Sequence, residues 1–217
     1  MNKNQEDNLP KERILDEAET LFAQKGYHAV SIREITSAAR CNLAAVNYHF
    51  GNKKSLYLEV FRSRWVPRAR RIREHVKESL SAQDPLSPHS VVQALAQGFL
   101  EGPQTDEERL RHSQLMFREM GHPTEAFELV AEQVMRPFFK ELADILRPVM
   151  SENMGEERLM LNILSVFAMV LYFNFARVAV SRITGREYDS MFKARLVEQM
   201  VDFSISGLGV GEKENSR

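Results

Sequence analysis

Apolar residues recur at helical spacing along most of the chain, and no stretch alternates apolar and polar residues for long enough to form a strand. The first such run predicts a helix that buries Ile14, Ala18, Leu21 and Phe22 and ends at Gly26. Glycine and proline, at 10 and 8 of 217 residues, are few enough to leave long helices uninterrupted. The sequence therefore predicts an all-α fold.

Residues 31–54 predict two short helices joined by a tight turn. Ser31 and Glu34 form an S-x-x-E capping box, so the first of these helices should begin at Ile32. Asn42 is a favoured N-cap residue and predicts where the second helix begins. The arrangement is typical of a helix-turn-helix.

The second of these helices is predicted to have one apolar side and one mixed side. Its apolar side should carry Leu43, Val46 and Phe50. Small, amide and aromatic side chains point away from that side or lie on its flanks: Ala44, Ala45, Asn47, Tyr48 and His49. Such a face suits the major groove of DNA, where it can meet base edges and thymine methyl groups.

Residues 11–57 resemble the N-terminal DNA-binding domain of the TetR family of bacterial transcriptional regulators. The resemblance rests on the runs KERILDEAETLFAQKGY, SIREI and NYHFGNKKSLY. It implies an N-terminal three-helix helix-turn-helix domain followed by a larger C-terminal helical domain for ligand binding and dimerisation. The chain departs from the family pattern in the turn, where many members have glycine and this chain has Arg40 followed by Cys41. Arginine adopts a positive φ only at some cost.

By match to the family motif, the resemblance implies contacts with a double-stranded DNA operator. The residues implied at or near base edges and backbone are Ala44, Ala45, Asn47, Tyr48 and His49. The residues implied to hold phosphates are Ser31, Arg33 and Lys53. A packing role for Tyr48 and a structural hydrogen bond for His49 are the alternatives.

A connecting helix is predicted to begin near Lys53 and to be kinked or broken near residues 63–66, because Pro67 falls inside it. Four arginines follow: Arg68, Arg70, Arg71 and Arg73. They either add phosphate contacts or form a solvated helix face. A linker rich in proline, serine and aspartate at 81–90 marks the end of this unit.

The remainder predicts helices at about 89–101, 106–120, 124–150, 156–183 and 188–206. The run FREMGHPTEAF and a later RPFF are similar to a TetR subset related to the regulator YbiH. We expect five parts: a disordered arm at 1–10, the helix-turn-helix domain at 11–57, a connecting helix and linker at 58–87, a helical effector-binding and dimerisation domain at 88–206, and a flexible tail at 207–217.

The segment from Leu159 to Val180 is the most apolar and raises the question of a membrane span. Polar residues interrupt it at Asn162, Ser165, Asn174 and Arg177. No clean run reaches the roughly 20 apolar residues that a bilayer requires. We therefore expect no membrane contact and a helix buried on all sides.

A homodimer is expected because one short recognition helix reads only a few base pairs, and specific affinity usually requires two half-sites. A stripe of small residues would let a partner helix approach closely: Ser165, Ala168, Ala176 and Ala179. The following helix would complete a four-helix interface with Phe192, Leu196, Met200 and Phe203.

The resemblance also implies a pocket for an unknown small-molecule effector, because C-terminal domains of the family commonly enclose one. Its apolar walls are expected from Phe99, Met116, Phe117, Met120, Phe138 and Phe167. Asn174 and Arg177 project from the inward side of the apolar helix, where polar groups need a partner. That partner is either the effector or Glu119 or another acid in a core pair.

The net charge of −1 conceals an asymmetry. Residues 1–80 carry 15 Lys and Arg against 10 Asp and Glu, a net charge of +5, whereas the rest carry 14 against 20, a net charge of −6. A basic N-terminal part fits a DNA-facing domain.

Cys41 is the single cysteine, so no intramolecular disulfide forms. For its role we favour a small buried hydrophobic residue over a redox switch. We expect a cytoplasmic protein.

No catalytic or metal-binding pattern stands out: there is no phosphate-binding GxxxxGK[ST], no HExxH, and no histidine pair at metal-binding spacing. We therefore expect no enzyme, no cofactor and no metal. The favoured function is a ligand-responsive DNA-binding regulator, a repressor released from a palindromic operator by a small molecule. The alternative is a helical ligand- or protein-binding module without operator specificity, such as a nucleoid or division factor.

Overall fold

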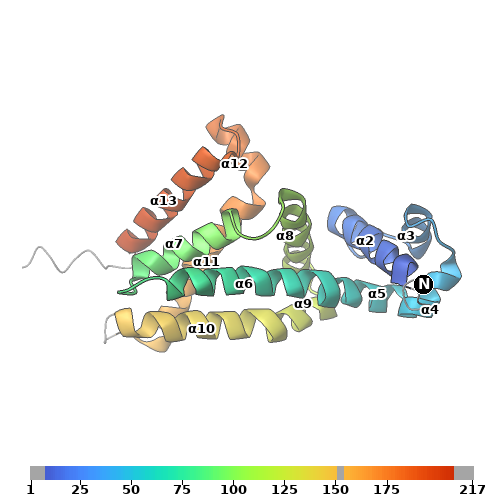
Figure 1. Ribbon diagram of the computed structural model, residues 1–217, viewed down its shortest axis with the longest axis horizontal. Helices are drawn as coiled ribbons and strands as arrows, with labels where there is room; N and C mark the ends of the chain where they lie inside the picture. The colour runs from blue at the N-terminus through green and yellow to red at the C-terminus, as the bar shows by residue number, and fades with distance from the viewer. Residues whose placement is uncertain (1–7, 151–153, 208–217) are drawn as a thin grey trace, which may run out of the picture. The chain divides into compact units, whose positions relative to one another are not determined.

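The computed structural model describes residues 8–150 and 154–207. Within these residues the chain forms helices joined by turns and loops, and it forms no strand (Figure 1). The α-helices, in chain order, are α2 (Asn8–Lys25), α3 (Ile32–Ala38), α4 (Leu43–Phe50), α5 (Lys53–Val60), α6 (Val66–Ser81), α7 (Pro88–Leu100), α8 (Asp106–Gly121), α9 (Glu125–Val130), α10 (Arg136–Leu146), α11 (Glu156–Phe175), α12 (Arg177–Thr184) and α13 (Ser190–Gly207). The predicted all-α fold is confirmed.

The ends of the described chain are helical where irregular segments were expected. The arm expected at 1–10 begins outside the described residues, but its last three residues, 8–10, form the first turn of α2, where a proline is tolerated. The tail expected at 207–217 lies outside the described residues except for Gly207, which ends α13.

The helices form two compact units that do not follow chain order. The first unit contains the described residues up to Ala69 together with Thr105–Val134, and the second contains Arg70–Gln104 and the described residues from Met135 onward. Helices α8 and α9, which lie in the range 88–206, thus pack with the helix-turn-helix segment. In the second unit α7 packs against α11 and α13, and α10 packs against α11.

The core of the first unit forms where α2 meets the helices that follow it. Ile14, Ala18 and Phe22 are fully buried, as the helical spacing predicts, whereas Leu21 is half-buried. The Phe22 ring meets the Tyr57 ring edge-on at 4.9 Å, and Tyr57 meets Phe61 at 5.2 Å. The first contact holds α2 against α5, and the second extends the ring cluster into the turn that follows α5.

The predicted distortion before Pro67 is confirmed as a π-helical turn, η1 (Phe61–Trp65), that joins α5 to α6. The Val66 N–H donates to the Phe61 carbonyl, one residue further back than in an α-helix. Proline lacks an N–H and its ring clashes with the carbonyl four residues earlier, so the widened turn accommodates it without ending the helix. A second π-helical turn, η2 (Ala131–Met135), and a 3₁₀ turn, η3 (Arg147–Val149), divide the helix expected at 124–150.

Helix α11 corrects two expectations about the apolar segment. The helix expected at 156–183 breaks at Ala176, so α11 ends at Phe175 and α12 follows. Burial on all sides is also wrong, because Leu161, Leu164 and Tyr172 are 55%, 41% and 54% exposed. By length and composition α11 would also pass for a membrane-spanning helix, as the core helix of a soluble protein does. Its packing against α7, α10 and α13 identifies it as a core helix with one side left uncovered.

Candidate nucleic-acid interface

Ser31 caps α3 and leaves the helix N-terminus open to solvent. Its Oγ accepts a hydrogen bond from the Glu34 N–H at 3.1 Å. The reciprocal half of the capping box is absent, because the Glu34 carboxylate accepts from Lys25 Nζ instead. This hydrogen bond from Lys25 lowers the pKa of Glu34. Ser31 is exposed, so its hydroxyl and the first N–H groups of α3 are accessible to an anion.

The turn between α3 and α4 adopts the left-handed conformation in spite of its arginine. Arg40 has φ of +50°, and the Cys41 N–H donates to the Thr36 carbonyl at 3.0 Å. A left-handed residue other than glycine costs about 1–2 kcal/mol. Burial raises the pKa of the Cys41 thiol, which disfavours the reactive thiolate and supports a packing role.

Helix α4 presents a mixed face to solvent. Asn42 caps it as predicted, with Oδ1 accepting from the Ala45 N–H at 2.9 Å. Val46 is fully buried and Phe50 is 9% exposed, but Leu43 is 47% exposed, so its predicted place on the buried side is wrong. The other outward residues are Ala44, Asn47 and Tyr48, which are exposed, and Ala45 and His49, which are half-buried.

Lys53 begins α5 next to this face and is held by a residue that the sequence patterns did not single out. Its Nζ lies 4.5 Å from the centre of the Tyr27 ring, a cation–π arrangement. Partial burial lowers the pKa of Lys53. Tyr27 in turn packs on Tyr57 at 4.9 Å, so the ammonium position is tied to the core. The position of Tyr27, an aromatic residue directly after Gly26, was the only sequence feature that could have indicated this contact. Arg33, the remaining implied phosphate contact, is exposed on α3.

Helix α8 braces the helix-turn-helix through polar contacts with residues far apart in sequence. Tyr57 donates its phenol hydrogen to Glu119 Oε1 at 2.6 Å, and Glu119 is 1% exposed. Burial, together with this bond, raises the pKa of Tyr57 far above its usual range. Glu119 also accepts from the Thr124 N–H at 2.9 Å. Arg118 donates to the carbonyls of Ala23 and Gln24, and its side chain thereby caps the C-terminal end of α2.

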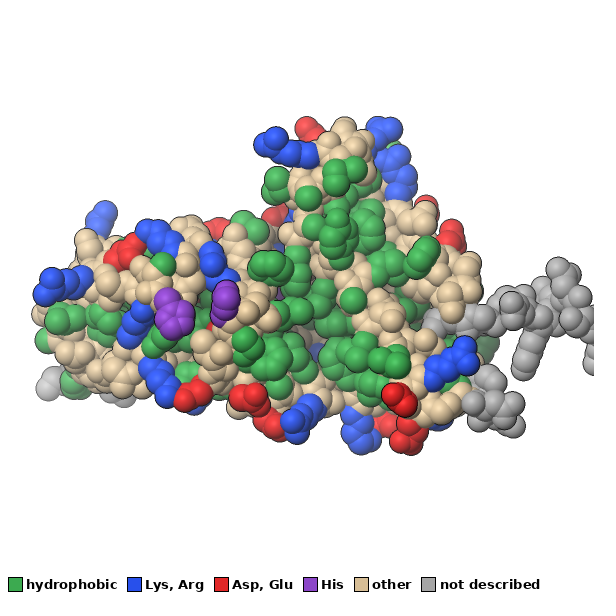
Figure 2. Space-filling model, turned by 180° about the vertical axis from the view of Figure 1, so that it is seen from behind, with side chains coloured by type: hydrophobic (Ala, Val, Ile, Leu, Met, Phe, Trp, Pro, Cys, Tyr) green, Lys and Arg blue, Asp and Glu red, His purple; other side chains and the backbone are tan. Residues whose placement is uncertain are grey.

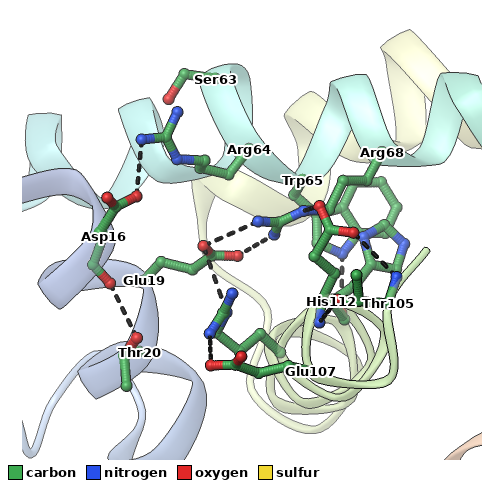
Figure 3. Close-up of polar contacts among 12 residues, drawn as sticks. Asp16, Glu19, Thr20, Ser63, Arg64, Trp65, Arg68, Thr105, Glu107 and His112 are labelled. Carbon is green, nitrogen blue, oxygen red and sulfur yellow. Dashed lines mark hydrogen bonds and ion pairs between the residues drawn. The ribbon is translucent and has the colours of Figure 1, made fainter. Parts of the chain in front are cut away.

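A buried ion pair joins α2 to the first turn of α6 (Figure 3). Arg68 donates two hydrogen bonds to the Glu19 carboxylate, and the two residues are 7% and 2% exposed. Arg111 Nε lies 3.6 Å from the same carboxylate, and Glu108 lies 3.4 Å from Arg68 Nε. Neither a phosphate contact nor a solvated face therefore describes Arg68, and both readings of it were wrong.

The other three arginines of the basic run belong to the second unit. Arg73 Nε donates to Glu141 at 2.6 Å, which is an intramolecular ion pair. Arg70 and Arg71 are exposed. The run is therefore not one basic surface.

The single tryptophan packs within the same region of the first unit (Figure 3). The Trp65 ring stacks on the His112 ring with 4.2 Å between centres and 8° between planes. Trp65 Nε1 also donates to the His112 carbonyl at 3.0 Å. The stacking and the hydrogen bond together connect Trp65 to α8 beside the Glu19–Arg68 pair.

The residues expected to wall an effector pocket are divided between the two units. Met116, Phe117 and Met120 lie on α8 in the first unit. The other three lie in the second unit and form an aromatic cluster of Phe99, Phe138 and Phe167. The centre of the Phe167 ring is 5.3 Å from that of Phe99 and 6.0 Å from that of Phe138. The set expected from sequence is thus not gathered round one hollow within either unit.

Asn174 and Arg177 contact each other in the second unit. Arg177 Nη2 donates to Asn174 Oδ1 at 3.2 Å, and Asn174 is 6% exposed. The Arg177 guanidinium also lies 5.2 Å from the Tyr188 ring centre. Glu119, named as one acid that could be their partner, accepts hydrogen bonds from Tyr57 and Thr124 instead.

Two hollows are lined by described residues of the second unit. An open groove of about 620 Å³ lies between α6 and α10, with Lys77, Leu80 and Ile145 among its lining residues. A void of about 20 Å³ lies among α7, α10 and α11 and has little more room than one water molecule needs. Neither is lined by the aromatic cluster or by Asn174 and Arg177.

The expected dimer residues divide into buried and exposed groups. Phe192, Leu196 and Met200 are 8%, 6% and 0% exposed in the core of the second unit, so that side of α13 already faces its own chain and is not available to a partner. Ser165, Ala168 and Ala179 are exposed and Ala176 is half-buried. Phe203 is 67% exposed.

Large apolar side chains are exposed on the same helices as the exposed small residues, and Figure 2 shows apolar atoms crowded over the C-terminal helices. We call this set the C-terminal apolar face: Leu161, Leu164 and Tyr172 of α11, Val178 and Ile183 of α12, and Met191 and Phe203 of α13.

Among the described residues, no group of three or more His, Cys, Asp or Glu is placed to hold a metal ion.

Comparison with known families divides the chain into two matched parts. Residues 14–60 match the model of bacterial regulatory proteins of the tetR family. Residues 88–208 match the model of the C-terminal domain of the HTH-type transcriptional dual regulator CecR.

Curated relatives agree with both matches. The chain is 26% identical over 209 residues to the HTH-type transcriptional dual regulator CecR of Shigella flexneri, over 91% of this chain and 92% of that protein. It is 40% identical over 47 residues to the biofilm operon icaADBC HTH-type negative transcriptional regulator IcaR of Staphylococcus aureus (strain Newman), which covers 22% of this chain and 25% of that protein.

Solved structures share the fold. The TetR family transcriptional regulator PfmR from Thermus thermophilus aligns with a TM-score of 0.60 at 19% identity, over 95% of this chain and 97% of that chain. A putative TetR-family regulator from Mesorhizobium loti aligns with a TM-score of 0.60 at 17% identity, over 97% and 98%.

Proposed function

Since the chain belongs to the TetR family of bacterial transcriptional regulators and carries a C-terminal domain of the CecR type, we propose that it represses transcription as a homodimer and that a small molecule releases it from a palindromic operator. The coarser part of this function follows from family membership. The protein is a DNA-binding transcriptional regulator and not an enzyme.

The observation that carries the proposal is the exposed face of α4, which is flanked in sequence by the N-terminus of α3 and by Lys53 at the start of α5. In our proposal Ala44, Ala45, Asn47, Tyr48 and His49 meet base edges and the adjacent backbone. Ser31, Arg33 and Lys53 hold the phosphates on either side. The 78% exposure of Tyr48 supports a DNA contact over a packing role. His49 is half-buried and approaches Tyr48 at 5.0 Å between ring centres, so it also supports the Tyr48 ring.

We infer that dimerisation uses the C-terminal apolar face. An isolated exposed leucine is ordinary, but seven large apolar side chains on three consecutive helices need cover. Ser165 and Ala168 lie on the same side of α11 as Leu161, Leu164 and Tyr172, so small residues would let the partner helix come close. The two recognition helices of such a dimer would read two half-sites.

We further propose that the effector site is in the second unit, at the cluster of Phe99, Phe138 and Phe167. These rings come from α7, α10 and α11, so an apolar or aromatic ligand that parts them would shift three helices at once. Asn174 and Arg177 would exchange their mutual hydrogen bond for one to the ligand. Release from DNA then requires that the ligand bind one of two conformations more tightly.

The direction of regulation is open to a direct test because the relatives differ. CecR is described as a dual regulator and IcaR as a negative one. We expect footprinting on DNA upstream of the protein's own gene to reveal a protected palindrome, and a reporter driven by that DNA to rise when the gene is deleted. Binding that shows no preference over competitor DNA would favour the module without operator specificity.

The effector site has its own test. Calorimetry with a compound that releases the wild type from DNA should show weaker binding to Asn174→Ala and to Arg177→Ala. Gln83→Ala, a change at an exposed linker position of the same unit, serves as the control. If both variants fold, bind and release like the wild type, the effector site lies elsewhere, and the groove between α6 and α10 becomes the next place to examine.

A further inference from the structure

Leu43 is an apolar residue exposed on the face that the proposed function sends into DNA. It is the first residue of α4 and is 47% exposed, while Val46 and Phe50 of the same helix are 0% and 9% exposed. Its sequence spacing from these two residues is that of a core position. The structure instead leaves about half of its surface exposed to solvent, at 47%.

The position of Leu43 on the helix joins it to the outward residues. At roughly 100° per residue, Leu43, Asn47, Ala44 and Tyr48 fall in that order within an arc of about 140°. All four are exposed. In helix-turn-helix proteins the N-terminal residues of the recognition helix contact base edges, and Leu43 occupies that end of α4.

We propose that Leu43 recognises the C5-methyl group of a thymine in each half-site of the operator. Leucine has no hydrogen-bonding atoms in its side chain, so it cannot select the donors and acceptors of the other base edges. Thymine is the one standard base that offers a methyl group in the major groove, and apolar side chains select it. Ala44, the neighbouring apolar residue, has a much shorter side chain. This inference rests on the proposed function, because it requires α4 to enter the major groove.

Removing one methyl group from the DNA tests the contact without disturbing base pairing. Wild-type protein first selects duplexes from a random library. The selected duplex is then synthesised with each thymine replaced singly by uracil, and affinity is measured at constant salt. We expect one thymine per half-site at which loss of the methyl weakens wild-type binding about fourfold, the value for burying one methyl-sized group. At that position Leu43→Ala should bind the two duplexes equally.

A matched variant separates Leu43 from its neighbour and from a general loss of affinity. Ala44→Gly alters the adjacent position of α4 and should retain the same uracil-sensitive thymine. A cytosine at that position should be bound better by the wild type when it is 5-methylated, and Leu43→Ala should not distinguish the two. The salt dependence of binding should not change in Leu43→Ala, because no phosphate contact is lost.

The outcomes decide between the contact and its alternatives. If no thymine is more sensitive to methyl loss in the wild type than in Leu43→Ala, the residue reads no methyl group and the inference fails. If Ala44→Gly abolishes the sensitivity and Leu43→Ala keeps it, Ala44 is the reader. If the wild type selects no sequence at all, operator recognition itself fails, which is a result distinguishable from the other two.

Discussion

At the scale of single residues, Lys53 links the candidate DNA surface to the core beneath it. Its ammonium lies over the Tyr27 ring. Lys53→Ala should weaken binding to all DNA sequences alike and reduce the slope of log affinity against log salt by roughly one unit, because one phosphate contact is lost. Fluorescence anisotropy over a salt series measures both quantities.

The neighbouring lysine supplies the control for this change. Lys54 pairs with Glu125 at 2.5 Å and points to α9, so Lys54→Ala should leave the salt slope near the wild-type value. A wild-type slope in Lys53→Ala would remove Lys53 from the list of contacts.

Arg40 carries a backbone strain that a glycine would relieve. Its φ of +50° costs a residue with a Cβ about 1–2 kcal/mol, whereas the greater flexibility of glycine in the unfolded chain offsets roughly 0.5–1 kcal/mol. Arg40→Gly should therefore raise the free energy of unfolding by up to about 1.5 kcal/mol, as measured by urea denaturation. Arg40→Ala keeps the Cβ and should show no such gain. Equal stability of the two variants would argue against the left-handed turn.

Tyr188 makes the stability of the second unit decrease with rising pH in the alkaline range. Burial raises the pKa of its phenol from 10.0 to about 12, and the phenol donates to the Phe173 carbonyl. A raised pKa means that the folded state favours the neutral phenol. Its contribution to stability is therefore complete below about pH 10 and is lost as the pH rises through about 12.

Tyr188→Phe should lower the free energy of unfolding at neutral pH by about 1 kcal/mol through loss of a hydrogen bond, and the difference from wild type should shrink above about pH 10. Urea denaturation at a series of pH values measures it. Tyr48→Phe, at a position 78% exposed, should stay near wild type at neutral pH. A difference that grows with pH would contradict the assignment.

At the scale of elements, the Glu19–Arg68 pair holds α2 against the start of α6. Removing one partner leaves a buried charge without its counter-ion, which costs about 3–5 kcal/mol. Arg111 lies near Glu19 and would partly compensate its charge. We therefore expect Arg68→Met to lower the free energy of unfolding by about 2–3 kcal/mol. Urea denaturation of Arg68→Met, Glu19→Met and the double variant gives the coupling energy.

The double variant should be more stable than either single variant, because apolar groups of similar size replace both charges. Arg70→Met, an exposed change on the next turn of α6, is the matched control and should have little effect. Additive effects of the two single changes would mean that Glu19 and Arg68 do not act as a pair.

At the scale of the whole molecule, the proposed dimer gives the most direct test of assembly. Ala168 is exposed within its own chain, so Ala168→Arg should fold, yet it would place a charge in the interface without a partner. Sedimentation should then show monomers, and operator binding should weaken by orders of magnitude as the second half-site is lost. Gln83→Arg, at an exposed linker position, should remain dimeric. A dimeric Ala168→Arg that still binds its operator would place the interface elsewhere.

Most local features of the chain were predictable because they depend on residues close in sequence. Caps at Ser31 and Asn42 and the distortion before Pro67 arise from side chains and backbone groups within about one helical turn. The family resemblance added to these local signals the two-domain organisation and the residues expected to contact DNA. The half-formed capping box shows the limit, because Lys25 lies outside that turn and takes the Glu34 carboxylate.

Only the tertiary structure decided which side of α11 and α13 is covered and whether Leu43 of α4 is buried. Leu43 is exposed while Phe192, Leu196 and Met200 are buried, although all four are apolar at helical spacing. Hydrophobicity shows that a side chain gains from burial, but burial also requires another element opposite it. The bond between Tyr57 and Glu119 spans 62 residues of chain, so no local pattern indicates it. The sequence by itself thus determined the all-α fold class and the family, and packing between distant helices decided that α8 belongs with the DNA-binding helices and that α11 keeps one apolar side open.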